Sequence, residues 1–213
     1  MENYIIFDID GTLNKTECYV FEAYQMALKK YGRHDVTNEE IRNIIGCTPK
    51  EIVKILLPHL SEDMWEEWIL EADNCEKQLL EEYAMAFEGA EEVLQKLKAD
   101  GYKLAVCSNA TMEHIEMVLK AIGLYDYFDV YQSVEAGLDT KAKTLQKLLQ
   151  RVQTKTACMV GDRKFDKQAA TYNEIYFIGC AYGYAPQEVK EADVVVKSPS
   201  EIYEAVCRLL PKQ

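Results

Sequence analysis

The sequence lacks a long apolar run and has few basic residues. No run approaches the roughly 18–20 residues that cross a bilayer, and the first residues, Met1-Glu2-Asn3-Tyr4, lack the basic segment of a secretory signal. Only 24 Lys and Arg stand against 36 Asp and Glu, a formal charge of −12, which would repel a nucleic-acid backbone. We therefore expect a cytoplasmic protein without a membrane or nucleic-acid partner.

Cysteine pairs, glycine and proline are also scarce. The seven cysteines form no C-x-x-C pair and are odd in number, so we expect reduced thiols such as Cys107 and Cys158 to be small buried hydrophobes. With 10 Gly, 5 Pro, 48% hydrophobic and 28% charged residues, the chain is neither collagen-like nor disordered. Its 213 residues suit one large domain or a core with an insert.

Short apolar runs alternate with amphipathic helical patterns. Because the runs are continuous rather than alternating, they predict strands buried on both faces, as in a parallel sheet. The helical patterns between them favour right-handed crossovers and a doubly wound α/β core. The predicted strands cover residues 4–7, 103–107, 128–131, 157–160, 175–178 and 194–196.

About 95 residues separate the first two strands, and helical patterns fill this gap. We predict helices near 16–31, 38–45, 49–57 and 62–83, with Thr37 and Ser61 as N-caps. The last of these helices is rich in acidic residues, which we interpret as a solvated face. Residues 15–85 are therefore predicted to be an all-helical insert, and residues 1–14 and 86–213 the α/β core.

The strongest motif, Phe7-Asp8-Ile9-Asp10-Gly11-Thr12-Leu13, directly follows the first strand. Ligands of an open parallel sheet bind beyond the carboxyl ends of its strands. One carboxylate there can attack phosphorus, and a second, protonated carboxyl can give the leaving oxygen its proton. A calcium loop is disfavoured because Leu13-Asn14-Lys15 follows in place of further regularly spaced acids.

Ser108 and Asn109 end the second predicted strand. A hydroxyl and the following backbone N–H groups at a strand-to-helix turn suit phosphate oxygens. The same pair before Thr111 could equally cap the next helix. The sequence leaves both interpretations open.

Two further segments supply charge. Lys141, at the start of a predicted helix, could offset the charge of a phosphate and a carboxylate together, with Lys143 as its alternative. Asp162 and Asp166, after the strand at 157–160, would face the same way on a helical turn. Mg²⁺ takes few carboxylates together with water and phosphate oxygens, so these two acids are candidate metal ligands.

Together these motifs resemble the haloacid dehalogenase superfamily, and the insert resembles the helical cap of its phosphoglycolate phosphatase-like branch. The resemblance implies that Asp8 is the nucleophile, Asp10 the general acid and base, and Lys141 the motif lysine. It assigns phosphate binding to Thr12, Ser108 and Asn109. Mg²⁺ would be held by Asp8, the backbone carbonyl of Asp10, Asp162 and Asp166, the last directly or through water.

The predicted function is a Mg²⁺-dependent phosphatase that hydrolyses a small phosphorylated metabolite through an aspartyl phosphate, as a monomer or homodimer. A phosphomutase of the same fold, similar to β-phosphoglucomutase, is the first alternative. A signalling module with a phosphorylated aspartate is less consistent with an aspartate on the first strand followed by a helical insert. The substrate is not predicted.

Overall fold

A six-stranded parallel sheet forms the centre of the protein, in a computed structural model that describes residues 2–134 and 140–211. The strand order is β3-β2-β1-β4-β5-β6, which confirms the predicted doubly wound α/β fold. The strand predicted at 128–131 instead forms at Val130–Gln132. The strands are β1 (Tyr4–Phe7), β2 (Lys103–Cys107), β3 (Val130–Gln132), β4 (Ala157–Gly161), β5 (Tyr176–Cys180) and β6 (Val194–Val196).

Successive side chains of a strand point to opposite faces of the sheet, and here both faces are buried. In β1, Ile5 and Phe7 pack into one hydrophobic core, and Ile6 packs into another. Cys107 and Cys158 are fully buried and unpaired, as predicted. The continuous apolar runs therefore reflect two cores, one on each face of the sheet.

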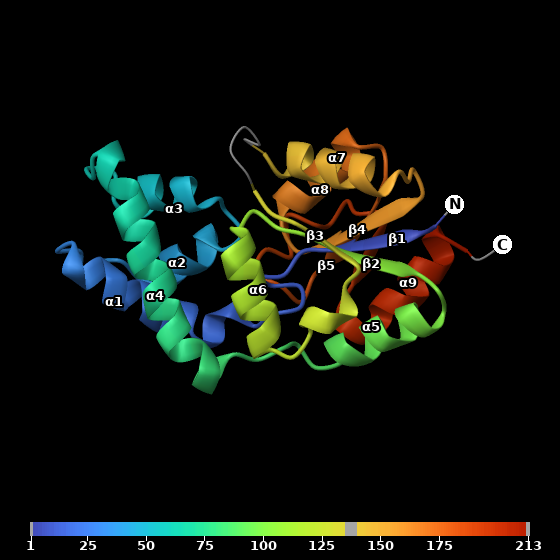
Figure 1. Ribbon diagram of the computed structural model, residues 1–213, viewed down its shortest axis with the longest axis horizontal. Coiled ribbons are helices and arrows are strands. Elements are labelled where there is room, and N and C mark those ends of the chain that lie inside the picture. Colours follow the sequence, from blue (N-terminus) through green and yellow to red (C-terminus); the bar gives the residue numbers. More distant parts are fainter. Residues whose placement is uncertain (1, 135–139, 212–213) are drawn as a thin grey trace.

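Helices cover both faces (Figure 1). One face packs against α5 (Ala90–Ala99), α6 (Met112–Ala121) and α9 (Ile202–Leu209), and the other against α7 (Lys141–Val152) and α8 (Lys164–Tyr172). Gly101 and Gly123 follow the ends of α5 and α6 with φ values of 81° and 73°, the left-handed conformation of a helix terminus. Within the described ranges, no helix has the length and apolarity that a membrane crossing requires.

The helices of residues 15–85 lie together beyond one end of the sheet (Figure 1). Two predicted helices begin as 3-10 turns, so they are shorter α-helices than expected. Thr37 forms the predicted cap and binds the N–H of Glu40, whereas Ser61 makes no side-chain cap bond. The elements are η1 (Thr16–Cys18), α1 (Val20–Lys30), α2 (Asn38–Ile44), α3 (Pro49–Leu56), η2 (Glu62–Met64) and α4 (Trp65–Tyr83).

The two chain segments that connect these helices to the sheet run side by side. Asn14 and Ala86 form an antiparallel bridge, and the N–H of Lys15 donates to the carbonyl of Met85 at 2.8 Å. The chain therefore leaves and re-enters the sheet region at one place. A division into core and cap at these positions stays a prediction.

Candidate active site

The loop after β1 carries Asp8 and Asp10 and is folded tightly against the loop after β4. Gly11 has φ of 78°, and a Cβ added there would lie 2.4 Å from Asp162 Oδ2. The backbone N–H groups of Leu13 and Asn14 both donate to the carbonyl of Ile9. This close approach requires glycine, and it brings the aspartates of two separate motifs together.

Lys141 joins this group from the first turn of α7. Its Nζ binds Asp8 Oδ1 and lies 2.6 Å from Asp166 Oδ1, and all three side chains are at most 4% exposed. Burial lowers the pKa of Lys141, but the charges of Asp166 and Asp8 outweigh it and raise the pKa. Lys143 is exposed, so Lys141 is the lysine that the fold brings to the aspartates.

Asp8, Asp162 and Asp166 form a buried carboxylate cluster. One oxygen from each lies within 4.8 Å of the others. Burial raises the pKa of Asp8 to about 7, with Lys141 opposing and Asp166 adding to the shift, and burial also raises the pKa of Asp162. Carboxylates gathered out of water need a compensating cation.

The hydrogen bonds of this cluster leave oxygens available for a metal ion. Asp162 Oδ2 accepts from the N–H of Tyr184 at 2.6 Å, and Asp166 Oδ2 from the N–H of Arg163 at 3.0 Å. Asp8 Oδ2 and Asp162 Oδ1 are buried and accept no hydrogen bond from any described residue. Hard cations such as Mg²⁺ prefer oxygen ligands of this kind, so the residues fit Mg²⁺.

Asp10 is not part of this cluster and lines a neighbouring cavity. Its Oδ1 accepts hydrogen bonds from Thr16 Oγ1 at 2.6 Å and from Asn14 Nδ2 at 3.2 Å. Asn14 in turn donates to the hydroxyl of Tyr19 at 2.7 Å. The two aspartates of the first motif therefore have different surroundings, although one residue separates them. The motif did not predict Thr16 as a partner of Asp10.

The cavity, of about 70 Å³, lies between the carboxyl edge of the sheet and helices α1, α4 and α6. Ser108 and Asn109 line it together with Asp10. Ser108 Oγ accepts from the N–H of Ala110, and Asn109 Nδ2 donates to the carbonyl of Gly46 at 2.8 Å. The fold thus brings Ser108 and Asn109 beside the first motif.

Thr12 is placed differently from the other predicted phosphate-binding residues. Its side chain is fully buried, and it is not among the residues that line the cavity. Its carbonyl accepts from the hydroxyl of Tyr182 at 2.8 Å. Its Oγ1 is buried and has no hydrogen-bond partner among the described residues, so phosphate binding by Thr12 stays a prediction.

Arg163 is a site residue that the sequence did not single out, although it directly follows Asp162. Its guanidinium donates to the carbonyls of Ile45 and Asn43, the latter at 3.1 Å, and pairs with Glu188 at 3.1 Å. It therefore ties the loop after β4 to the loop between α2 and α3. Its position between Asp162 and Asp166 is the only sequence signal that could have indicated this.

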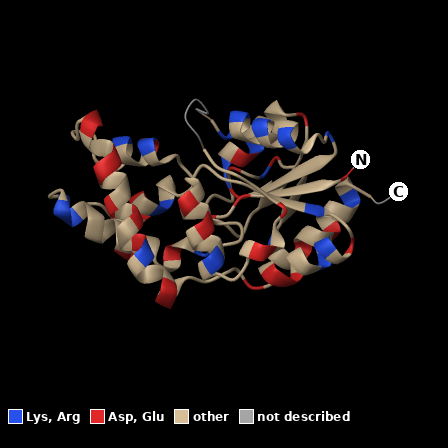
Figure 2. Cartoon of the chain, in the orientation of Figure 1, with Lys and Arg blue, Asp and Glu red and all other residues tan. Residues whose placement is uncertain are grey.

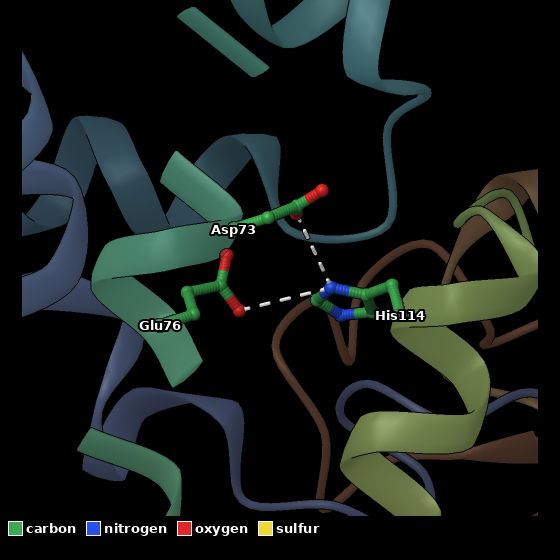
Figure 3. A group of neighbouring side chains, drawn as sticks. All are labelled: Asp73, Glu76 and His114. Atoms are coloured by element: carbon green, nitrogen blue, oxygen red, sulfur yellow. Dashed lines mark ion pairs between the residues drawn. The ribbon is translucent and has the colours of Figure 1, made fainter. Parts of the chain in front are cut away.

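The acidic helix α4 is only partly the solvated face that its composition predicts. Acidic positions are spread along it (Figure 2), but Glu76 is 2% exposed and lines the cavity. Asp73, one turn earlier, and His114 on α6 lie beside it (Figure 3). The sequence did not reveal this group because the contact between α4 and α6 is long-range.

Comparisons with known proteins agree with this geometry. A family model described as haloacid dehalogenase-like hydrolase matches residues 5–180. Pyrophosphatase PpaX of Bacillus thuringiensis (strain Al Hakam) is 27% identical over 168 residues, which cover 77% of this chain and 76% of that protein.

Two solved structures show the same fold at low sequence identity. A predicted phosphoglycolate phosphatase from Haemophilus somnus has a TM-score of 0.86 at 21% identity, covering 96% of this chain and 98% of the other. The β-phosphoglucomutase of Clostridium difficile has a TM-score of 0.83 at 19% identity, covering 99% and 97%. These two structures support the fold and do not identify a substrate.

Proposed function

Because the chain belongs to the haloacid dehalogenase-like hydrolases, we propose that it is a Mg²⁺-dependent phosphatase that cleaves a small phosphomonoester through a phosphorylated Asp8. The observation that carries this proposal is the pairing of Asp8. Its Oδ1 is held by Lys141, while its Oδ2 accepts no hydrogen bond within the described chain. One oxygen is therefore fixed, and the other is available to attack phosphorus.

The buried carboxylates account for the metal. Asp162, Asp166 and the backbone carbonyl of Asp10 would hold Mg²⁺ together with Oδ1 of Asp8, so that Oδ2 of Asp8 stays free for the attack. When bound, Mg²⁺ would offset the negative charges of carboxylate and phosphate so that they can approach each other. Lys141, which contacts both Asp8 and Asp166, would supply a second positive charge.

Proton transfer is assigned to Asp10. As Asp8 forms its bond to phosphorus, the bond from phosphorus to the leaving oxygen breaks, and Asp10 donates a proton to that oxygen. Asp10 then accepts a proton from the water that attacks the aspartyl phosphate, which releases phosphate and restores Asp8. Thr16 and Asn14 both bind Oδ1, so we assign the proton to Oδ2.

Residues around the cavity would bind the rest of the substrate. Ser108 and Asn109 would contact the phosphate oxygens. Residues 15–85, which we propose form the cap, supply the wall of the cavity that faces the sheet edge. A covered site of this kind excludes water from the first step.

The experiment that tests this function replaces Asp8 by asparagine, which has nearly the same shape but cannot attack phosphorus. With p-nitrophenyl phosphate and Mg²⁺, we expect Asp8→Asn to lower kcat at least about a thousandfold while circular dichroism stays unchanged. The control is Asp63→Asn, which makes the same change at an exposed position. If Asp8→Asn retains a tenth of the parent rate, Asp8 is not the nucleophile.

The same assay separates the alternatives. Steady release of inorganic phosphate without an added sugar bisphosphate supports a phosphatase, whereas dependence on such a bisphosphate supports a phosphomutase. A signalling module would be phosphorylated once without repeated turnover.

A further inference from the structure

Three ionisable side chains meet at the side of the cavity that residues 15–85 contribute to. Asp73 and Glu76 come from α4, and His114 comes from α6 (Figure 3). His114 Nδ1 lies 3.7 Å from Asp73 Oδ1 and 4.0 Å from Glu76 Oε2. All three residues line the cavity that Asp10 and Ser108 also line. This group, the α4–α6 cluster, is therefore positioned to contact the leaving group of a phosphorylated substrate.

Glu76 is the member with unused binding capacity. Its side chain is 2% exposed, and among the described residues no donor binds its Oε2. The 4.0 Å that separates this oxygen from His114 Nδ1 is too long for a hydrogen bond. A buried carboxylate oxygen without a donor is unfavourable, so a ligand that donates a hydrogen bond to Glu76 would be stabilised there.

The charged groups that line the cavity indicate which kind of ligand group would donate a hydrogen bond to Glu76. Asp10, Asp73 and Glu76 contribute three carboxyl groups and His114 the single imidazole, and no Lys or Arg of the described residues lines it. Asp10 holds the transferable proton and is neutral. With His114 protonated, the carboxylates of Asp73 and Glu76 still exceed its single positive charge, so a second anionic group on the substrate would be repelled.

The remaining wall is apolar. Trp68 and Tyr24 pack edge to face with ring centroids 5.8 Å apart, and both line the cavity with Val20 and Ile44. Such a wall suits methylene groups, and aromatic rings also attract a nearby cation. The cavity therefore combines a short apolar path with a carboxylate end.

We propose that the substrate is a phosphorylated amino alcohol, whose ammonium group binds Glu76 and Asp73 while its phosphate binds at Asp8 and Ser108. This inference rests on the phosphatase function proposed above and specifies its substrate class. Pyrophosphate and phosphoglycolate, which appear in the names of two similar proteins, would each place a negative charge against the α4–α6 cluster. We expect both to be poor substrates of this protein.

Three esters of matched length test the proposal: 2-aminoethyl phosphate, 2-hydroxyethyl phosphate and phosphoglycolate. Their leaving groups carry an ammonium, a neutral hydroxyl and a carboxylate. We expect kcat/KM to fall in that order, by roughly tenfold or more from the first to the second. A kcat/KM for 2-hydroxyethyl phosphate or phosphoglycolate equal to or above that for 2-aminoethyl phosphate would overturn the proposal.

Two variants locate the preference. Glu76→Gln and Asp73→Asn each keep the shape and remove one charge, so the ratio of kcat/KM for the aminoethyl over the hydroxyethyl ester should fall towards one. Glu81→Gln is the matched control because Glu81 is an exposed acid on the same helix, and it should keep the parent ratio. A ratio unchanged in both Glu76→Gln and Asp73→Asn would contradict the assignment. Asp73, which is 36% exposed, provides the test if Glu76→Gln does not fold.

The two proposals fail in different ways. If Asp8-dependent hydrolysis of p-nitrophenyl phosphate is present but the three esters react equally, the amino-alcohol proposal is wrong and the phosphatase function stands. If no phosphomonoester releases phosphate in the presence of Mg²⁺, both proposals are wrong.

Discussion

Two side chains of the same type can have different contacts in this protein, because the fold buries one and exposes the other. Lys141 and Lys143 are two positions apart, yet Lys141 is buried against Asp8 and Asp166 and Lys143 is exposed. The apolar positions Leu145, Leu148 and Leu149 already favour Lys141, because a lysine four residues before Leu145 lies on the same face of the helix. The contacts of Lys141 Nζ with Asp8 and Asp166 confirm that placement. The catalytic role of Lys141 remains a prediction.

At the residue scale, His114 should make stability depend on pH. Burial lowers its pKa, but Glu76 and Asp73 raise it more, to about 9 from the ordinary 6.5. A folded-state pKa above the unfolded value contributes stability that is present below about pH 6.5 and lost as pH rises through about 9, up to about 3 kcal/mol. We expect His114→Gln to flatten the fall in unfolding free energy between pH 6.5 and 9, as measured with urea.

The control for this experiment is His59→Gln, since His59 is exposed in the loop after α3. It should keep the pH dependence of the parent. An equal slope in His114→Gln and the parent would show that His114 titrates as it does in the unfolded chain.

At the scale of elements, Arg163 fastens the loop between α2 and α3 to the loop after β4. Gly46 in that loop has φ of 87°, and a Cβ there would lie 3.3 Å from Arg163 Cγ, so the two loops touch closely. We expect Arg163→Met to lower the free energy of unfolding by about 3 kcal/mol, because the carbonyls of Ile45 and Asn43 and the carboxylate of Glu188 lose their charged donor. Urea denaturation measures this loss.

Arg163→Lys is the informative partner of that variant. Lysine keeps the charge but lacks the planar fork that binds several acceptors at once, so its stability should lie between those of the parent and Arg163→Met. We also expect KM to rise in both variants, because Ile45 and Gly46 of the fastened loop line the cavity. If both variants have the stability and the KM of the parent, Arg163 does not hold the loop in place.

Local capping chemistry was predictable to different degrees along the insert. The side chains of Thr37 and Thr48 each accept a hydrogen bond from the backbone N–H of a glutamate three residues later. The carboxylate of that glutamate in turn accepts from the backbone N–H of the threonine. The first cap is predicted from the sequence above and the second is not, although Thr48-Pro49-Lys50-Glu51 has the same pattern. The long predicted helix at 62–83 begins as a 3-10 turn at Glu62–Met64, an end effect that residue pattern rarely resolves.

For the whole molecule, the cluster of Asp8, Asp162 and Asp166 should link folding to metal. A ligand that binds only the folded state stabilises it, by about 2.7 kcal/mol when its concentration is a hundred times Kd. We expect Mg²⁺ to raise the urea midpoint relative to EDTA at equal ionic strength.

Asp162→Asn is the control for the metal effect. It should weaken the response to Mg²⁺ because a ligand is lost. It should also raise stability in EDTA, because burial of the Asp162 carboxyl raises its pKa and disfavours its charged form. A parent midpoint that does not move in saturating Mg²⁺ would contradict the assigned metal site.

The sequence by itself determined the elements and the motifs at their ends. Continuous apolar runs specify strands buried on both faces, and the polar residues after β1, β2 and β4 meet because parallel strands end at one edge of a sheet. Asp8, Ser108 and Asp162 could therefore be selected in advance, since each follows a strand directly. Their selection needed only local pattern and the rule for parallel sheets, whereas the roles predicted for them are what the resemblance to the family implies.

Only the tertiary structure decided which helices of residues 15–85 face the carboxyl edge of the sheet. The contacts between Arg163 and Ile45 and between Glu76 and His114 join segments far apart in the chain. Whether an acid on an amphipathic helix is solvated or buried depends on the neighbour that packs against it, and α4 acquires that neighbour only when it meets α6. For this physical reason the motifs at the strand ends could be predicted from the sequence, whereas the carboxylates proposed to recognise the leaving group could not.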